Sequence, residues 1–227
     1  MTPDEQKRAV GEAAADLVEP GMVVGLGTGS TAAWFVRALG ARKADIRGVA
    51  TSEATADLAR LMKIPLLELD EAGQIDLTVD GADEIGPGLS LIKGGGAALL
   101  REKLVWEASK TCVAIADGSK NVPKLGAFPL PIEVVAFGHS TTARRVNAVL
   151  KAHGFAAEAR LRVKDGAVVR TDGGNLIYDA ALGAIDDPAA RAAALKAVTG
   201  VVEHGLFLGL ARRALLGTDA GVVTLTA

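Results

Sequence analysis

The chain has 227 residues, a length that suits one large core or two smaller domains. Apolar residues make up 49% of it and charged residues 23%, which excludes a disordered chain. The formal net charge is −2 and no basic stripe is present, so the charges give no case for nucleic-acid binding.

Residues 4–116 are expected to alternate between helices and strands. Apolar residues at helical spacing predict a helix over 4–18, which Pro20 and Gly21 end. The same kinds of pattern predict helices over 32–39, 53–62 and 97–109, and strands over 22–27, 46–50, 66–69, 76–79 and 111–116. This alternation predicts an α/β fold with a mostly parallel sheet and helices on both faces. Ligands of such sheets bind beyond the carboxyl ends of the strands, where the glycine-rich and acidic segments of this chain fall.

The character of the sequence changes near 128–131. The patterns there predict a strand over 132–137, a helix over 141–152, a hairpin of 158–164 and 167–171 around Asp165-Gly166, a strand over 175–179, a helix over 188–198 and a strand over 201–203. This β-α-β-β-α-β order predicts a small α+β unit. From residue 205 the chain is expected to rejoin the first sheet, so that 1–128 with 205–227 forms the main α/β domain and 129–204 a smaller, inserted α+β domain.

The first glycine-rich segment is Gly-Leu-Gly-Thr-Gly-Ser-Thr at 25–31. Its glycines let the backbone approach an anion. Ser30 or Thr31 is expected to cap the helix that follows, whose free N–H groups attract phosphate. The pattern is neither G-x-G-x-x-G nor a P-loop, which disfavours a dinucleotide or ATP. A tight turn that binds nothing is the alternative.

Three acids follow the fourth predicted strand, in Asp80-Gly81-Ala82-Asp83-Glu84. Like charges this close together cost stability unless cations or ligand hydroxyls offset them, and they can raise a pKa. A solvated acidic turn and a divalent-metal site are the alternatives. No histidine is nearby and no spacing is diagnostic of a metal, which disfavours the second.

Lys93 precedes three glycines, Gly94, Gly95 and Gly96. Glycine N–H groups beside a fixed positive charge are typical of a site that stabilises an oxyanion.

Glu102 is expected about two turns into the helix that follows these glycines. Its neighbours three and four positions away are all apolar: Ala98, Leu99, Val105 and Trp106. Burial of that face would raise the pKa of Glu102, which suits a carboxylate that takes and returns a proton. Arg101 has apolar neighbours at the same spacing, and an ordinary solvated glutamate is the alternative.

Other reactive residue types carry less signal. Lys120, in an Asp-Gly-Ser-Lys segment after a strand, is placed to reach a phosphate, although a solvent-facing lysine is the simpler interpretation. Cys112 lies in an apolar strand and is expected to be a passive core residue. His139, His153 and His204 have no spacing of a triad or zinc site, so surface or structural roles are expected for them.

In this order and spacing, the segments resemble type A ribose-5-phosphate isomerase. The likeness covers nearly the whole chain and rests on the Gly-Thr-Gly-Ser-Thr loop, Asp-Gly-Ala-Asp-Glu-Ile at 80–85, Lys-Gly-Gly-Gly-Ala-Ala at 93–98, Arg-Glu-Lys at 101–103 and Thr-Asp-Gly-Gly-Asn at 171–175. Gly118 stands where alanine is more usual. The resemblance implies a Rossmann-like catalytic domain with a smaller inserted α+β (ferredoxin-like) domain, no metal or cofactor, and a homodimer, with a tetramer as the alternative.

The resemblance also implies the site. It places the general base at Glu102 and further catalytic groups at Asp80, Asp83 and Lys93. It places contacts to a pentose 5-phosphate at Thr28, Gly29, Ser30, Thr31, Gly81, Ala82, Gly94, Gly95, Gly96 and Lys120.

Alternative functions are an amino-sugar phosphate isomerase-deaminase or a lactonase on a related fold, a CoA transferase with a glutamate nucleophile, and a sugar-phosphate sensing domain of a transcription regulator. The sensor would need a DNA-binding module, for which the chain offers neither a basic patch nor a spare N-terminal segment. No apolar run approaches about 18 residues, and the first residues lack the apolar core of a signal peptide. We therefore expect no membrane partner and a cytoplasmic location.

Overall fold

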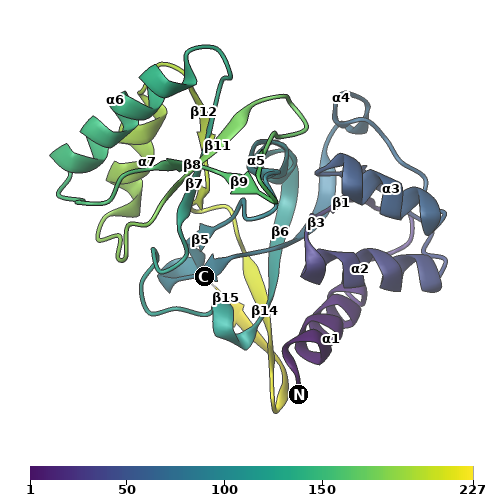
Figure 1. Ribbon diagram of the computed structural model, residues 1–227. Helices are drawn as coiled ribbons and strands as arrows, with labels where there is room; N and C mark the ends of the chain where they lie inside the picture. The colour runs from purple at the N-terminus through teal and green to yellow at the C-terminus, as the bar shows by residue number, and fades with distance from the viewer. Residues whose placement is uncertain (227) are drawn as a thin grey trace. The chain divides into compact units, whose positions relative to one another are not determined.

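The computed structural model describes residues 1–226, and the chain divides into two compact units (Figure 1). The first unit holds Met1–Ala82, Arg101–Asn121 and Gly209–Ala227, and the second holds Asp83–Leu100 and Val122–Leu208. The sequence patterns place the domain boundaries at 128 and 205, and these boundaries stay a prediction.

The first unit is built on a six-stranded sheet. Its strands are β1 (Val23–Leu26), β2 (Arg47–Ala50), β3 (Ile75–Gly81), β6 (Ser109–Asp117), β14 (Arg213–Thr218) and β15 (Gly221–Thr226). They lie in the order β15-β14-β6-β3-β1-β2, and every pair is parallel except β14 with β15. The predicted mostly parallel sheet is confirmed, and so is the return of the C-terminal segment to it.

Helices cover both faces of this sheet. They are α1 (Pro3–Ala15), α2 (Ser30–Ala41), α3 (Glu53–Leu61), the short α4 (Leu69–Ala72), and α5 (Leu99–Glu107), which belongs to this unit from Arg101 onward. Figure 1 draws α1, α2 and α3 grouped beside β1 and β3, and α1 and α2 bury Val10 and Phe35 against Leu26 and Ile115. On the other side, Val105 of α5 packs with Val23, Val49 and Ile75.

The second unit contains a four-stranded antiparallel sheet with two helices. Its elements are β7 (Leu130–Val134), α6 (His139–Ala152), β8 (Arg160–Leu161), β11 (Leu176–Ala180), α7 (Pro188–Lys196) and β12 (Val201–His204). The strand order β12-β7-β11-β8 and the β-α-β-β-α-β sequence of elements are those of a ferredoxin-like unit, as predicted. The hairpin around Asp165-Gly166 is also present, with β9 (Val163–Lys164) paired to β10 (Ala167–Val168).

The same unit holds a small sheet that the sequence patterns did not predict. In it β5 (Leu91–Ile92) lies between β4 (Glu84–Ile85) and β13 (Leu206–Phe207), and a 3-10 turn, η1 (Pro87–Leu89), connects β4 to β5. This pairing explains why residues 83–100 group with the second unit.

Two predicted elements differ in the structure. The strand expected over 66–69 is wrong: Leu66 makes a single bridge to Gly48, and the acidic residues after it form α4. The helix expected from 97 begins at Leu99, because Ala97 has φ 59°, a left-handed conformation outside the helical region.

Candidate active site

The order of strands in the first unit reverses next to β1. The chain runs from β1 to β2 on one side and then to β3 on the other, so β1 and β3 flank a topological switch point. In open α/β sheets, ligands bind outside the carboxyl ends of the strands at such a point. The segments that follow β1 and β3 are the loop 27–29 and Asp80-Gly81-Ala82.

Asp80 ties these two segments together. It is 0% exposed, and its Oδ1 accepts hydrogen bonds from the N–H groups of Thr28 (3.0 Å) and Gly81 (2.7 Å). Backbone N–H groups that point at a carboxylate stabilise its charge. A Cβ on Gly27 would lie 2.3 Å from the same Oδ1, so only glycine at 27 leaves room for Asp80.

The loop 27–29 leads directly into α2. Gly29 is the N-cap residue, with φ 107° and ψ 176°, a conformation that favours glycine. The expectation that Ser30 or Thr31 caps this helix is therefore wrong, since both lie inside its first turn. Their N–H groups belong to the turn whose donors have no intrahelical acceptor, which is the feature that attracts an anion to a helix N-terminus.

A cluster of hydroxyl groups holds the Thr28 side chain. Thr28 Oγ1 lies 2.7 Å from Thr51 Oγ1, 2.7 Å from Ser52 Oγ and 3.1 Å from Thr55 Oγ1. Thr55 also donates to the carbonyl oxygen of Gly27 (3.0 Å). Sequence reasoning missed this support; the available signal was a Thr-Ser pair directly after β2, with Ser52 as the N-cap of α3.

Lys120 lies at the end of η2 (Gly118–Lys120), immediately after β6. Asp117 shapes this turn, because its Oδ1 accepts hydrogen bonds from both the backbone N–H (3.1 Å) and the hydroxyl of Ser119. Gly118 N–H donates to Gln6 Oε1 (3.2 Å), which fastens the turn to α1. The half-buried Lys120 thus follows the strand next to β3, whose end carries Asp80.

Glu102 is 4% exposed, and its apolar neighbours at helical spacing are buried too: Ala98, Leu99, Val105 and Trp106. Because α5 begins at Leu99, Glu102 lies in its first turn and not two turns into it. At that position the positive end of the helix dipole stabilises a carboxylate.

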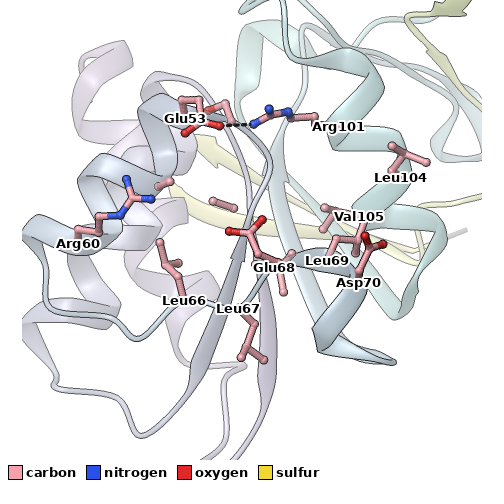
Figure 2. Close-up of a pocket in the computed structure, with 14 residues that line it drawn as sticks. Glu53, Arg60, Leu66, Leu67, Glu68, Leu69, Asp70, Arg101, Leu104 and Val105 are labelled. Carbon is pink, nitrogen blue, oxygen red and sulfur yellow. Dashed lines mark hydrogen bonds and ion pairs between the residues drawn. The ribbon is translucent and has the colours of Figure 1, made fainter. Parts of the chain in front are cut away.

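The contacts of Arg101 differ from those of Glu102. Its guanidinium forms an ion pair with Glu53 of α3 (2.8 Å), which Figure 2 shows at the rim of a pocket of about 350 Å³. The pocket also has Arg60, Glu68 and Asp70 in its lining. Helical spacing gave Arg101 and Glu102 similar apolar neighbours. In the structure, Arg101 lines this pocket.

The second unit places Asp83 against the glycine loop 94–96. Asp83 Oδ2 accepts a hydrogen bond from the N–H of Gly95 (2.8 Å), and a Cβ on Gly95 would lie 2.6 Å from Asp83 Oδ1. Gly94 has φ 106°, and Gly95 and Gly96 are exposed. This loop therefore combines a bound carboxylate with exposed backbone donors.

Lys93 begins the loop and is 2% exposed. Its N–H donates to the carbonyl oxygen of Gly205 (2.9 Å), and its Nζ lies 5.4 Å from the centre of the Phe207 ring, a cation–π distance.

The three acids of 80–84 have separate surroundings. Asp80 binds the loop after β1, Asp83 binds Gly95, and Glu84 accepts hydrogen bonds from the N–H groups of Gly126 (2.7 Å) and Phe128 (2.5 Å). Backbone donors thus offset part of their charge, and Glu84 holds the 126–128 segment.

The predicted site residues fall into two sets. The first unit contains Thr28, Gly29, Ser30, Thr31, Asp80, Gly81, Ala82, Glu102 and Lys120, and the second contains Asp83, Lys93, Gly94, Gly95 and Gly96. Within residues 1–226, no three His, Cys, Asp or Glu side chains group as metal ligands do. Over the same residues, none of the helices has the length and apolar character needed to span a bilayer.

Comparison with known proteins agrees with these features. The family model of ribose 5-phosphate isomerase A (phosphoriboisomerase A) matches residues 47–221. Ribose-5-phosphate isomerase A of Caulobacter sp. strain K31 is 70% identical over 225 residues, which are 99% of each chain. The protein of that name from Parvibaculum lavamentivorans is 52% identical over 97% of each chain.

Solved structures show the same fold. The crystal structure of ribose 5 phosphate isomerase A from Neisseria gonorrhoeae has a TM-score of 0.92 at 37% identity, covering 99% of this chain and 97% of that one. A D-ribose-5-phosphate isomerase in complex with phospho-erythronic acid has a TM-score of 0.93 at 38% identity over 100% of both chains. The chain belongs to the ribose 5-phosphate isomerase A family.

Proposed function

We propose that the protein interconverts D-ribose 5-phosphate and D-ribulose 5-phosphate, an aldose–ketose exchange of the non-oxidative pentose phosphate pathway. The observation that carries the mechanism is the buried carboxylate of Glu102 in the first turn of α5. Relatives that are 70% and 52% identical over nearly their whole length bear the isomerase name, so the deaminase and sensor alternatives are not favoured.

Glu102 acts as the base in this proposal. It removes the proton from C2 of the open-chain aldose, the electrons move to the C1 oxygen, and an enediolate forms. The hydroxyl proton of O2 passes to O1, a transfer that Asp80 and Asp83 assist, and Glu102 returns the first proton to C1, which leaves the carbonyl at C2. One carboxylate serves both carbons because they are adjacent on the same face of the intermediate.

Charge on the enediolate oxygens needs donors. Lys93 and the N–H groups of 94–96 supply them, since preorganised donors stabilise charge that develops in the transition state. A relative at 38% identity was solved with phospho-erythronic acid, whose carboxylate, like an enediolate, has two coplanar oxygens that share negative charge.

The remaining residues position the sugar. The loop Thr28 to Thr31 with Lys120 holds the phosphate, while Asp80 and Asp83 hold sugar hydroxyls and assist ring opening. Comparing Asp80→Asn and Asp83→Asn on cyclic and open-chain substrates tests this division, and equal losses on both substrates would exclude a ring-opening role.

The first experiment uses chelator-treated protein. Mixed with ribose 5-phosphate, it is expected to form ketopentose phosphate rapidly without added metal. Absence of conversion by folded protein would contradict the proposal.

Glu102→Gln tests the base, because it keeps the side-chain shape and removes basicity. Turnover should fall by roughly two to four decades. Glu107→Gln, an exposed change at the end of the same helix, should leave turnover unchanged. Near-normal turnover of Glu102→Gln, with circular dichroism equal to the parent's, would reject the assignment.

The resemblance supports two further parts of the proposal: a homodimer, with a tetramer as the alternative, and a cytoplasmic location. A chain mass of 23.2 kDa makes these states distinct in light scattering, and the mass of a single chain would exclude both oligomers.

A further inference from the structure

Arg162 lies between β8 and β9, and its side chain contacts the glycine loop 94–96. Its Nη1 donates to the carbonyl oxygens of Gly94 (2.9 Å) and Gly95 (3.0 Å). The other edge of its guanidinium binds both carboxylate oxygens of Asp179 on β11, with Nε 2.7 Å from Oδ2. The Arg162 side chain is only 14% exposed, so this arrangement is largely withdrawn from water.

These two bonds determine where the loop's donors point. In a trans peptide the C=O and the following N–H lie in one plane and point in opposite directions. With the carbonyls of Gly94 and Gly95 turned to one nitrogen of Arg162, the N–H groups of Gly95 and Gly96 point away from it. The N–H of Gly95 confirms this direction, since it binds Asp83 Oδ2 at 2.8 Å.

The loop needs such an anchor because glycine has no conformational preference of its own. Gly94 and Ala97 both have positive φ, 106° and 59°, and Gly95 and Gly96 are exposed. A bidentate guanidinium–carboxylate pair is geometrically specific, because its fork matches the carboxylate in one orientation. Asp179 therefore fixes Arg162, and Arg162 fixes two of the loop's peptide planes.

We propose that Arg162 is a positioning residue for isomerisation: its bonds to Gly94 and Gly95 hold the N–H of Gly95 on Asp83 and aim the N–H of Gly96 at the oxyanion. This inference rests on the proposed function. Arg162 touches the loop and is assigned no contact with the substrate. Its loss should therefore weaken transition-state stabilisation more than substrate binding.

Arg162→Ala tests the inference. We expect kcat to fall about 10- to 100-fold with KM within about threefold, since small misplacement of preorganised donors costs rate. Arg162→Lys keeps the charge but loses the fork, so its kcat should lie between those of the parent and Arg162→Ala. Lys196→Met is the matched control: Lys196 also binds a carboxylate (Glu203, 2.7 Å) and a carbonyl oxygen (Val202, 2.6 Å) in this unit, but not the loop. Its kcat should be unchanged.

Chemical rescue separates positioning from general support of the fold. A cavity of about 540 Å³ is lined by Gly95, Gly96, Arg162 and Asp179, among others, so small cations from solution can reach the position that the side chain leaves. Guanidinium or methylguanidinium at low millimolar concentration should raise kcat of Arg162→Ala several-fold and leave the parent protein unaffected. If Arg162→Ala does not fold because Asp179 loses its partner, Arg162→Ala with Asp179→Asn removes both charges and receives the same assay.

The amide resonances of Gly95 and Gly96 provide a readout that does not depend on activity. They should shift, and their hydrogen exchange should accelerate, in Arg162→Ala but not in Lys196→Met. Unmoved resonances, a kcat within twofold of the parent, or a loss of kcat that no guanidinium restores would each overturn the inference. An inactive parent protein would overturn the proposed function instead, and the resonances would still decide whether Arg162 orients the loop.

Discussion

At the scale of single residues, packing against the neighbouring strand explains part of the glycine content of the loop after β1. A Cβ on Gly25 would lie 1.9 Å from Thr78 Oγ1, and one on Gly27 would lie 2.3 Å from Asp80 Oδ1. Both clashes are with β3, the neighbouring strand. Gly29 differs, since a Cβ there would meet nothing within 4 Å. Its φ of 107° is what favours glycine at this position. The loop after β1 is thus glycine-rich for two separate reasons.

Gly27→Ala is expected to displace Asp80. The new methyl group cannot be accommodated without shifting β1 or the carboxylate, so overpacking should cost about 1–3 kcal/mol of stability. Turnover should fall as well, because the Thr28 N–H bond to Asp80 would be disturbed. Urea unfolding and turnover together check this. Gly173→Ala, whose methyl would meet its nearest neighbour at 3.6 Å, is the control, and equal effects of the two changes would disprove the argument.

At the scale of elements, Asp76 joins three strands. It lies in β3; its Oδ2 accepts the N–H of Val23 at the start of β1 (2.9 Å), and its Oδ1 pairs with Lys110 of β6 (2.7 Å). The hydrogen bond from Lys110, and after it that from Val23, lowers the pKa of Asp76. β3 is thereby linked by side-chain bonds to both of its neighbours in the sheet.

Asp76→Asn should therefore destabilise the protein by about 1 kcal/mol at neutral pH. The folded pKa lies below the unfolded value of about 4, so the contribution is complete above that value and is lost as pH falls through the folded pKa. The difference between parent and variant in denaturant unfolding should shrink between pH 7 and pH 3. Asp57→Asn, which breaks an exposed pair with Arg60, should change little at either pH. A difference independent of pH would refute the electrostatic account.

Helix patterns predicted the long helices because each buries a periodic apolar face. Apolar runs predicted the central strands because strands such as β1 are buried on both faces. These patterns failed where a single backbone angle sets the start of a helix, or where a segment distant in sequence pairs with a short strand. The helix of Glu102 begins two residues late because Ala97 is left-handed, and the strands of β4, β5 and β13 are too short for any alternation to be visible.

The candidate site was predictable where its residues are contiguous and chemically distinctive, as in Lys93 and the glycines that follow. Thr51 and Thr55, which hold Thr28, are unremarkable until β2 is placed beside β1. Arg162 lies 67 residues beyond Gly95, and no local pattern indicates their contact. Such supporting residues require the tertiary structure.

At the scale of the whole molecule, Cys112 reports on unfolding. It lies in β6, between β3 and β14, and is 3% exposed. Burial, followed by the charge of Asp80, raises the pKa of its thiol to about 12. The thiol also donates to the carbonyl oxygen of Trp106 (3.3 Å). The prediction of a passive core residue therefore has a physical basis.

Labelling of Cys112 by a thiol reagent at pH 8 should require the sheet to open. Since global opening of a typical domain is strongly unfavourable, the reaction should be at least about a thousand-fold slower than in denaturant. Mass spectrometry then counts one label per unfolded chain, because the sequence has one cysteine. Fast labelling of protein whose circular dichroism is intact would contradict the burial argument.

The position of β14 also bears on synthesis at the ribosome. The chain of the second unit is complete at Leu208. In contrast, β6, which pairs with β3 on one side, receives its second parallel partner only when β14, at Arg213–Thr218, has been made. Until then the apolar strand Cys112-Val113-Ala114-Ile115 presents an unpaired edge, the kind of surface that joins other chains. All residues of the second unit are thus synthesised before the six-stranded sheet of the first unit has its last two strands. Pairing of β14 with β6 therefore closes an edge that is expected to favour aggregation of the growing chain.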